Sequence, residues 1–278
     1  MTEQVAVRPF SGGCGAVVEG VDLAQLSASH WRVVRDAFND NGLVFFRSQT
    51  LSQADHLRFA EGWGEIVINK YFPSTKRFPQ IAEVRKEANQ KTNIGGGWHA
   101  DHSYDQEPAL GSILVAREVP NAGGDTLFAN LYGAYEALSD GLKATLEGLR
   151  AVHANHHIYG PEGKLRNSDI GHLLGGADNT SEATHPVVVT HPGSGRKALY
   201  VNPGHTRYFE GWTVEESASL LQYLYVHAAR PEFTCRFRWE PGSVAFWDNR
   251  CVQHYALNDY PGMTRRMHRV TVMGDRPV

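Results

Sequence analysis

The strongest constraint on the fold is a series of short strand-like segments separated by turns in the second half of the chain. Residues 233–239 alternate apolar and polar side chains, which predicts an extended segment with one buried face. Further apolar segments follow at 243–247 and 270–273, and Pro192-Gly-Ser-Gly195 between two apolar stretches predicts a hairpin. Many short strands of this kind are typical of a barrel or a double-sheet jelly roll.

The sequence also contains signals of several helices between the predicted strands. They are Ser29 as an N-cap, Ser52 with Asp55 and Thr213 with Glu216 as capping boxes, and the apolar pattern of residues 131–149. The sequence therefore predicts a mostly β fold with α insertions. No internal repeat, low-complexity segment or linker divides the chain, so we expect residues 1–278 to form a single domain.

The charge balance and the cysteines exclude several classes of protein. The 27 basic and 30 acidic residues give a net charge of -3, which argues against a nucleic-acid partner. No run of about 18 apolar residues predicts a membrane span, and the first residues lack the pattern of a signal peptide. Cys14, Cys235 and Cys251 are odd in number and form no C-x-x-C pair, which argues against a disulfide framework. We expect a cytoplasmic protein.

Two segments carry the candidate chemistry: residues 95–104, which contain His99 and Asp101, and residues 245–255. In an extended strand, residues i and i+2 point to the same face, so the imidazole of His99 and the carboxylate of Asp101 converge. A histidine from a distant strand would complete a facial set of two histidines and one carboxylate, the ligand set of non-haem Fe(II) oxygenases.

An oxygenase that uses 2-oxoglutarate must also hold the far carboxylate of that dicarboxylic acid. Arginine suits this task because its guanidinium pairs with a carboxylate through two parallel hydrogen bonds. Arg265 follows the second segment, and Thr126 lies within Gly123-Gly-Asp-Thr-Leu-Phe128. Both are candidates for that carboxylate.

On these motifs the sequence resembles the TauD/TfdA family, the taurine and 2,4-dichlorophenoxyacetate dioxygenase group of Fe(II)/2-oxoglutarate enzymes, over nearly its whole length. The motifs are Trp98-His-Ala-Asp101, Gly123-Gly-Asp-Thr-Leu127, His191-Pro-Gly-Ser-Gly-Arg-Lys197 with Tyr200-Val-Asn202, Trp247-Asp-Asn249, Gln253-His-Tyr255 and Arg265-Arg-Met-His-Arg269. The resemblance implies a double-stranded β-helix (jelly roll) core flanked by helices. It also implies a homo-oligomer, either a dimer or a tetramer.

The resemblance assigns roles to individual residues. His99, Asp101 and His254 are implied as Fe(II) ligands, and Thr126 and Arg265 as partners of the 2-oxoglutarate tail. Arg269 is implied to bind the anionic group of the primary substrate. Such an enzyme uses O2 and 2-oxoglutarate to hydroxylate a small organic anion and releases succinate and CO2. If the hydroxylated carbon bears a heteroatom, the product collapses and releases that group. Because halogenating relatives replace the carboxylate ligand by a small residue, Asp101 implies hydroxylation.

Three residues at positions that match the substrate-binding residues of taurine enzymes differ from those enzymes in this sequence. Asn69, Phe72 and Gly95 stand at the positions that match a histidine, a tyrosine and an asparagine there. These departures argue against taurine and leave a carboxylate, sulfonate or sulfate ester as the predicted substrate class. Asn69, Phe72 and Tyr159 are candidates for substrate binding, and Phe72, Tyr104 and Tyr159 for the lining of an apolar pocket. Residues 66–98 are expected to include an active-site loop.

Other histidines receive different interpretations. His102 would face away from the ligands on a regular strand, and His268 is expected to be structural. His153, His156 and His157 are interpreted as surface or supporting residues, with a substrate-loop role as the alternative. Two other functions stay open: a zinc hydrolase with the same ligands, which does not explain Thr126 and Arg265, and a non-catalytic anion-binding jelly-roll protein, which does not explain the ligand set.

Overall fold

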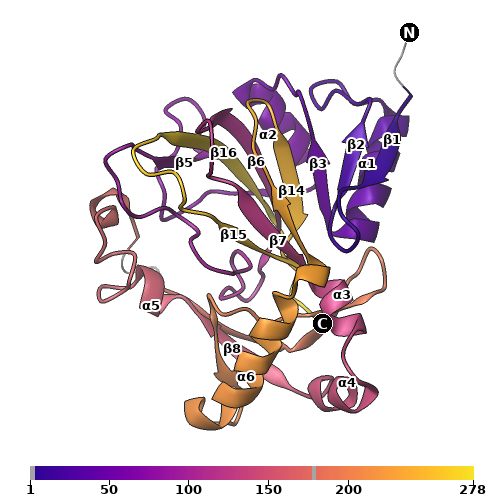
Figure 1. The fold of residues 1–278 in the computed structure, drawn as a ribbon, viewed down its shortest axis with the longest axis vertical. Helices are drawn as coiled ribbons and strands as arrows, with labels where there is room; N and C mark the ends of the chain where they lie inside the picture. Colours follow the sequence, from indigo (N-terminus) through magenta and orange to yellow (C-terminus); the bar gives the residue numbers. More distant parts are fainter. Residues whose placement is uncertain (1–3, 177–179) are drawn as a thin grey trace.

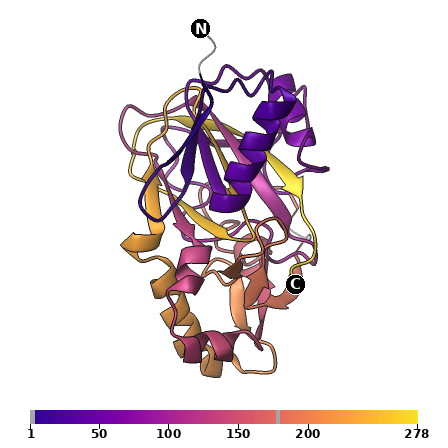
Figure 2. The same ribbon diagram turned by 90° about the vertical axis from the view of Figure 1, so that its right-hand side faces the viewer.

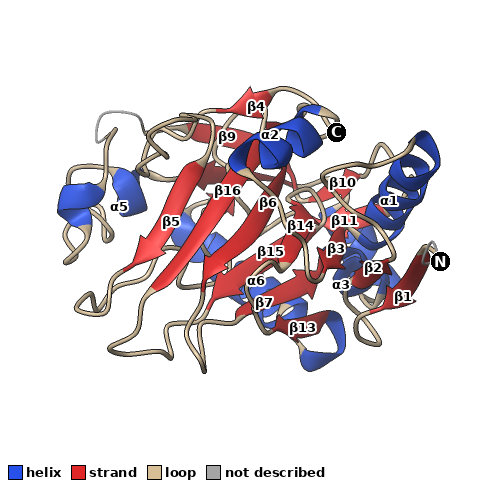
Figure 3. Cartoon of the chain, turned by 90° about the horizontal axis from the view of Figure 1, so that it is seen from above, coloured by secondary structure: helices blue, strands red, loops and turns tan. Residues whose placement is uncertain are grey.

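The computed structural model describes residues 4–176 and 180–278 and contains one large sheet that draws strands from both halves of the chain. Its strands lie in the order β1 (Ala6–Pro9), β2 (Ala16–Glu19), β3 (Leu43–Phe46), β14 (Val244–Asp248), β6 (Ala109–Glu118), β16 (Arg265–Met273) and β4 (Ile66–Val67), and β5 (Ala82–Lys86) also pairs with β16. Figure 3 shows β5, β16, β6 and β14 side by side.

A second sheet faces the large one and completes the jelly roll. It consists of β13 (Thr234–Phe237), β7 (Thr126–Asn130) and β15 (Val252–Ala256). Aromatic rings fill the space between the two sheets: Phe45 stacks on Phe237 with ring centroids 4.0 Å apart, and Phe128 contacts Trp247 at 5.6 Å. The predicted jelly-roll core flanked by helices is confirmed.

A lower part of the molecule holds the remaining strands. They are β8 (Arg150–Ala154), β9 (Glu182–Pro186) and β12 (Thr206–Phe209) in one small sheet, and β10 (Val188–Thr190) with β11 (Lys197–Leu199) in a two-stranded one. The pair β10–β11 confirms the hairpin that the sequence predicts around residues 192–195. In Figure 1 this part lies below the large sheet, together with α4 and α6.

Alternating side chains give the large sheet two buried faces. Leu43 and Phe45 of β3 belong to the core between the sheets, whereas Val44 and Phe46 belong to the core on the outer face. Because successive strand residues point to opposite faces, a strand that is apolar throughout must be covered on both sides. The facing sheet covers one side, and two helices cover the other.

Those two helices are α1 (Ala28–Asn41) and α2 (Gln53–Glu61), which lie over the outer face (Figure 2). Phe38 of α1 stacks on Phe246 of β14 at 4.0 Å. The other helices are α3 (Leu131–Glu136), α4 (Asp140–Leu146), α5 (His156–Tyr159) and α6 (Val214–Ala228), with 3-10 turns at Gly171–Leu173 and Pro231–Phe233. No helix in the described part of the chain is long and apolar enough to cross a membrane.

The helix boundaries test the capping predictions. The two capping boxes, Ser52 with Asp55 and Thr213 with Glu216, are confirmed as the starts of α2 and α6. The prediction of Ser29 as an N-cap was wrong, because Ser27 caps α1 and its hydroxyl accepts a hydrogen bond from the His30 backbone N–H. Both serines precede the same apolar pattern, so that pattern does not decide between them.

Strand β16 turns alternate residues toward the space between the sheets. Met267 belongs to the core between the sheets, whereas Val270 and Val272 belong to the outer core. Arg265 and Arg269, two residues to either side of Met267, therefore share its inner face. The fold thus brings two buried arginines into the jelly roll from one strand.

Two fully buried histidines make stability depend on pH. Burial lowers the pKa of His56 and of His153 to about 3, and the nearby positive charge of Arg117 adds a smaller contribution at His56. An unfolded histidine takes up a proton near pH 6.5. Between these pH values the unfolded chain binds more protons, so the free energy of unfolding falls as the pH falls below about 6.5.

We predict that each of these histidines contributes a slope of up to about 1.4 kcal/mol per pH unit between about pH 5.5 and pH 4. The His56→Gln variant keeps an N–H donor for the Ile113 carbonyl oxygen and does not titrate, so its slope should be smaller by that amount. Urea unfolding across this pH range measures the slope. An unchanged slope in the variant would contradict the assignment.

Candidate metal centre

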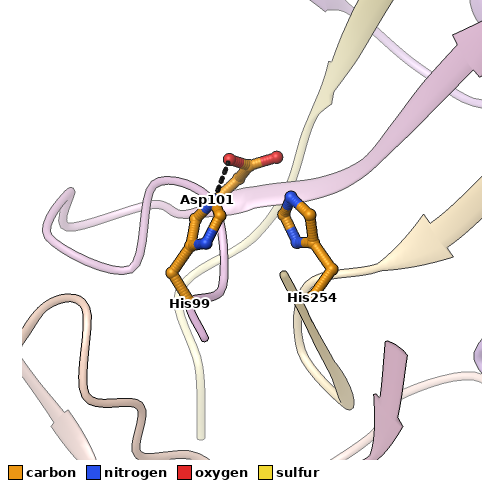
Figure 4. Close-up of side chains that lie close together, drawn as sticks. All are labelled: His99, Asp101 and His254. Atoms are coloured by element: carbon orange, nitrogen blue, oxygen red, sulfur yellow. Dashed lines mark ion pairs between the residues drawn. The ribbon is translucent and has the colours of Figure 1, made fainter. Parts of the chain in front are cut away.

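Three potential ligand side chains converge inside the jelly roll. One ligand atom from each of His99, Asp101 and His254 lies within 4.8 Å of the other two (Figure 4). Asp101 and His254 are buried, and His99 is half-buried. The structure therefore brings together the three residues that the sequence motifs single out.

A short backbone pairing positions the two histidines. The His99 N–H donates to the His254 carbonyl oxygen at 3.0 Å, and the His254 N–H donates to the His99 carbonyl oxygen at 2.8 Å. This isolated bridge fixes both Cα positions across the two segments. The rings consequently lie with their centroids 4.1 Å apart.

Asp101 reaches the same place by a turn and not by a strand. The extended geometry expected for residues 99–101 ends at His99, and residues 101–104 form a turn. The Asp101 N–H donates to Oδ1 of Asn249 at 3.2 Å, and the Trp247 indole donates to the same oxygen at 3.0 Å. The Trp247-Asp-Asn249 motif therefore anchors the turn that presents the carboxylate.

Hydrogen bonds orient two of the candidate ligands for a metal ion. Nδ1 of His99 lies 2.9 Å from the Gly97 carbonyl oxygen, which assigns the ring proton to Nδ1 and leaves the Nε2 lone pair free. The Ser112 hydroxyl donates to Oδ2 of Asp101 at 2.9 Å. Ligand histidines and carboxylates in metal sites are commonly fixed in this way.

The protonation states also suit a cation. Burial lowers the pKa of His254 well below its usual range, so its ring is neutral. Burial opposes ionisation of Asp101, but the positive charge of Arg269 acts against it, and the carboxyl pKa lies far below its usual range. Two imidazoles and one carboxylate are the donor set of non-haem Fe(II) sites, so the residues present fit that ion.

A second buried group, formed by His191, Asp248 and Cys251, does not fit a metal ion. Arg250 donates to both oxygens of Asp248, at 2.8 and 2.6 Å, and Nε2 of His191 lies 2.9 Å from Oδ2. Burial opposes the ionisation of Asp248, but Arg250 and His191 lower its pKa to about 2. The carboxylate is therefore already neutralised within the protein.

Arg265 is a buried cation with almost no protein partner. Its guanidinium lies 3.5 Å from the Thr126 hydroxyl, which also accepts a hydrogen bond from the Trp239 indole at 2.9 Å. No carboxylate of a described residue lies within ion-pair distance, and Nε of Arg265 has no partner. Burial lowers the Arg265 pKa, but a guanidinium stays protonated in proteins. Such a cation requires an anion, and a carboxylate fits it.

Arg269 lies beside the candidate metal ligands. Its Nη1 is 3.3 Å from Oδ1 of Asp101, and its guanidinium carbon is 5.4 Å from the centre of the Phe72 ring. Phe72 contacts Tyr159 at 6.2 Å, and Tyr159 contacts Tyr104 at 6.5 Å. The structure thus brings the predicted Phe72 and Tyr159 to the same side of the site as Arg269.

These rings belong to what we call the aromatic cluster, the small apolar group made of Tyr71, Phe72, Tyr104 and Leu174 with Ile94, Tyr159 and Leu165 packed against it. Asn69 lies outside the cluster. Its Oδ1 accepts hydrogen bonds from the backbone N–H groups of Tyr71 and Phe72 at 2.9 and 2.8 Å, so it supports the turn that carries Phe72.

Residues 66–98, within which the sequence predicts an active-site loop, contain two strands, β4 and β5. Glycines allow the last part of this segment to approach the ligands: Gly95 and Gly97 have φ angles of 81° and 121°, which side chains rarely tolerate. The Gly95 carbonyl oxygen accepts a hydrogen bond from the Ala256 N–H, two residues beyond His254.

The remaining histidines lie outside the ligand group. Nδ1 of His102 pairs with Oδ2 of Asp105 at 3.0 Å, and Nδ1 of His268 accepts a hydrogen bond from Arg117 on the outer face. His153 is fully buried and not a surface residue; its ring contacts His185 at 5.5 Å. His157 is close to the site, because its Nε2 lies 2.9 Å from the Gly204 carbonyl oxygen.

Sequence reasoning missed His205. Its ring centroid lies 6.1 Å from that of His99 and 4.8 Å from that of Tyr104, and it is buried. Burial lowers its pKa well below the usual range, so the ring is neutral. No spacing rule links His205 to residues 99–104; only the tertiary packing of the 202–206 turn does so.

Comparison with known proteins identifies the family. The family model described as "Taurine catabolism dioxygenase TauD, TfdA family" matches residues 6–271. The chain is 35% identical to an alkylsulfatase of Acinetobacter baylyi, covering 99% of this chain and 86% of that protein. It is 34% identical to an alpha-ketoglutarate-dependent sulfate ester dioxygenase of Pseudomonas putida, covering 99% and 91%. A solved structure, a taurine dioxygenase from Burkholderia xenovorans, matches with a TM-score of 0.83 and 36% identity over 99% of this chain and 92% of that one.

The chain therefore belongs to the TauD/TfdA family. It is an Fe(II)- and 2-oxoglutarate-dependent dioxygenase, an oxidoreductase that uses O2.

We predict that Gly204→Ala weakens metal binding by about 10- to 100-fold, the usual effect of disturbing a residue that supports a ligand. A Cβ at residue 204 would lie 2.6 Å from Cβ of His99, so either the turn or the ligand must move. Titration with Mn(II), followed by calorimetry, measures the effect. Gly148→Ala is the matched control, because nothing lies within 4 Å of a Cβ there. Equal metal affinity in both variants would contradict the prediction.

Proposed function

We propose that this dioxygenase hydroxylates a small organic anion, with His99, Asp101 and His254 holding Fe(II). The observation that carries the proposal is the pair of buried arginines on the inner face of β16. Arg265 has no acidic partner among the described residues, and the only acidic partner of Arg269 among them is the candidate ligand Asp101. Two anionic molecules entering one site would account for two such cations.

Each arginine receives a role from its neighbours. Arg265, with the Thr126 hydroxyl beside it, binds the far carboxylate of 2-oxoglutarate at the end of the jelly roll where β7 begins. Arg269, next to Asp101 and Phe72, binds the anionic group of the substrate. In this arrangement the substrate carbon to be hydroxylated is held close to the metal ligands, and orientation of this kind contributes much of an enzyme's rate enhancement.

The bound Fe(II) supplies the activation of O2, which oxidises 2-oxoglutarate to succinate and CO2 and hydroxylates the substrate C–H bond. The chain's own residues bind, orient and exclude water. The Gly97 carbonyl oxygen fixes the tautomer of His99, and the Ser112 hydroxyl holds one oxygen of Asp101. The buried aromatic cluster keeps water from the side of the site that receives the substrate.

The substrate class follows from the aromatic cluster and from the relatives. An apolar wall beside Arg269 suits an anion with an apolar body and a carboxylate, sulfonate or sulfate ester head. Relatives named for alkylsulfatase and sulfate ester dioxygenase activity support this class. If the hydroxylated carbon bears a heteroatom, the product releases that group. Asn69 and Phe72, where taurine enzymes have histidine and tyrosine, argue against taurine itself.

The other functions explain less of the structure. A zinc hydrolase would need the three ligands but gives no role to Arg265 with Thr126, and a non-catalytic anion-binding module gives none to the oriented ligand set. The family relationship also favours the oxygenase over both.

We further propose that residues 1–278 form one domain, because the large sheet combines strands from residues 6–19 with strands from residues 244–273. We propose a cytoplasmic location, in keeping with three buried and unpaired cysteines. A dimer or tetramer is proposed from the family relationship, and sedimentation of the purified chain tests it.

We predict that substitution of Arg265 affects mainly the binding of 2-oxoglutarate and that substitution of Arg269 affects mainly the binding of the organic anion. Arg265→Met should weaken 2-oxoglutarate binding by about 10- to 100-fold, the value of a charge-assisted pair, with metal affinity kept. Anaerobic titration of the Fe(II) enzyme, followed by its weak visible charge-transfer band, measures this affinity. Arg269→Met should leave that titration nearly unchanged and raise the KM for the organic anion.

Arg266→Met is the matched control, since Arg266 lies on the same strand and is half-exposed, 3.9 Å from Glu118. It should change neither quantity. A panel of alkyl sulfates, alkylsulfonates and aryloxyalkanoates, scored by succinate formation, supplies the substrate. Normal 2-oxoglutarate binding by Arg265→Met, or no succinate above background from any member of the panel with wild-type protein, would overturn the proposed function.

A further inference from the structure

His205 is a buried polar side chain that the proposed mechanism does not use. It is 3% exposed and lies in the turn between β11 and β12, with its ring centroid 6.1 Å from that of His99. The turn is held by its own bonds: the His205 N–H donates to Oδ1 of Asn202 at 2.9 Å, and the Ala154 N–H donates to the His205 carbonyl oxygen. The backbone is therefore fixed, and the ring is presented from a rigid support.

The imidazole of His205 has no hydrogen-bond partner among the described residues. Nδ1 is buried and unpaired, and no hydrogen bond joins Nε2 to a described residue. A neutral imidazole carries one N–H donor and one acceptor nitrogen, and burying either without a partner is costly. A partner is therefore expected from outside the chain, either water or a bound molecule.

The neighbours of His205 indicate that the hydrogen-bond partner of its imidazole lies between the candidate ligand His99 and the aromatic cluster. The His205 ring lies nearly perpendicular to the ring of His99, with centroids 6.1 Å apart, and nearly perpendicular to the ring of Tyr104 of the aromatic cluster, at 4.8 Å. Arg269 contacts Asp101 and Phe72, so a ligand with its head at Arg269 and its body against the aromatic cluster would lie between the candidate metal ligands and that cluster. His205, whose ring lies against both His99 and Tyr104, adjoins that region.

We propose that His205 is a specificity residue that hydrogen-bonds an oxygen atom joining the anionic head of the substrate to its apolar body. The inference rests on the proposed function and narrows its substrate class. It favours sulfate esters and aryloxy- or alkoxy-carboxylates over sulfonates and simple carboxylates of the same length. The last two place a methylene group where the first two place an oxygen, and a methylene group leaves the imidazole unpaired.

The bridging oxygen, which joins the anionic head of the substrate to its apolar body, also determines whether hydroxylation leads to cleavage of the product. A carbon bonded to such an oxygen becomes, after hydroxylation, a hemiacetal-type carbon that carries both a hydroxyl group and the bridging oxygen. The C–O bond between that carbon and the bridging oxygen then breaks, and the hydroxyl oxygen becomes the carbonyl oxygen of an aldehyde and loses its proton. The group that leaves with the bridging oxygen takes up a proton on it: this group is the sulfate head of a sulfate ester, and the phenol or alcohol body of an aryloxy- or alkoxy-carboxylate, whose head then keeps the aldehyde. No further oxidant is needed for this collapse. A hydrogen bond to the bridging oxygen therefore selects substrates that this enzyme can cleave.

A matched pair of ligands tests the proposal. An n-alkyl sulfate and the n-alkylsulfonate with one more carbon atom differ only in that a methylene group replaces the bridging oxygen. Dissociation constants are measured by calorimetry on the protein loaded with Mn(II) and N-oxalylglycine, which replace Fe(II) and 2-oxoglutarate and prevent turnover. The steady-state KM and kcat for both compounds are measured on the Fe(II) enzyme.

His205→Phe keeps a ring against His99 and Tyr104 and removes both nitrogens. We expect it to weaken binding of the alkyl sulfate by about three- to tenfold, the effect of one lost hydrogen bond, and that of the sulfonate by less than about twofold. The loss should appear in KM more than in kcat. His205→Gln, which keeps an N–H donor, should restore most of the preference for the sulfate.

His153→Phe is the control, since His153 is also fully buried with one unpaired nitrogen but its ring contacts His185 and Tyr200. It should leave the sulfate-to-sulfonate ratio unchanged. Thermal melting with Mn(II) checks that each variant is folded, and His205→Met replaces the phenylalanine variant if that one melts early.

The outcomes separate the inference from the function on which it rests. A sulfate-to-sulfonate ratio that is the same in wild type and His205→Phe, with both affinities reduced together, would show a packing role and overturn the inference. The same ratio with both affinities unchanged would also overturn it, while the proposed function stands. If the loaded wild-type protein binds neither compound nor any aryloxyalkanoate, the proposed function fails, and the inference fails with it.

Discussion

The pair of backbone hydrogen bonds between His99 and His254 is the interaction on which the rest of the site depends. It joins the long loop that follows β5 to strand β15 of the smaller sheet. Each bond contributes only about 1 kcal/mol to stability. Its importance is geometric, because it sets two ring positions at once and leaves the turn at residues 101–104 to supply the carboxylate. Asn249 and Trp247, which precede β15, then hold that turn.

In strand β16, alternate side chains point to opposite faces of the sheet, so one face of the strand serves the candidate site and the other serves packing. Its inner face carries Arg265, Met267 and Arg269, and its outer face carries His268 and the apolar residues that pack under the helices. A shift of one residue in its pairing with β6 would exchange the two faces and turn both arginines out of the jelly roll. The apolar outer core on Val270 and Val272 therefore also protects the site, since it penalises that shift.

The sequence predicts some of this organisation well and some of it not at all. Alternation and turn signals at residues 187–201 and 233–247 predict the strands, because those signals are local. The motif residues His99, Asp101 and His254 are found by their types and by family resemblance. The turn at Asp101 is not predicted, because Asn249 enforces it from a distant segment. His205 is not predicted for the same reason: its neighbours are set by how the 202–206 turn packs, and Gly204 matters only because His99 lies against it.

The central position of β14, between β3 and β6, has a consequence for biogenesis. A nascent chain on the ribosome carries β3, β6 and His99 long before β14, β15 and β16 have been translated. Strands β3 and β6 cannot pair with β14 until β14 has been translated, and such non-local strand pairing slows folding. Because His254 lies in β15, the three candidate ligands can come together only after that strand has been translated, and shorter nascent fragments carry only His99 and Asp101 of the set.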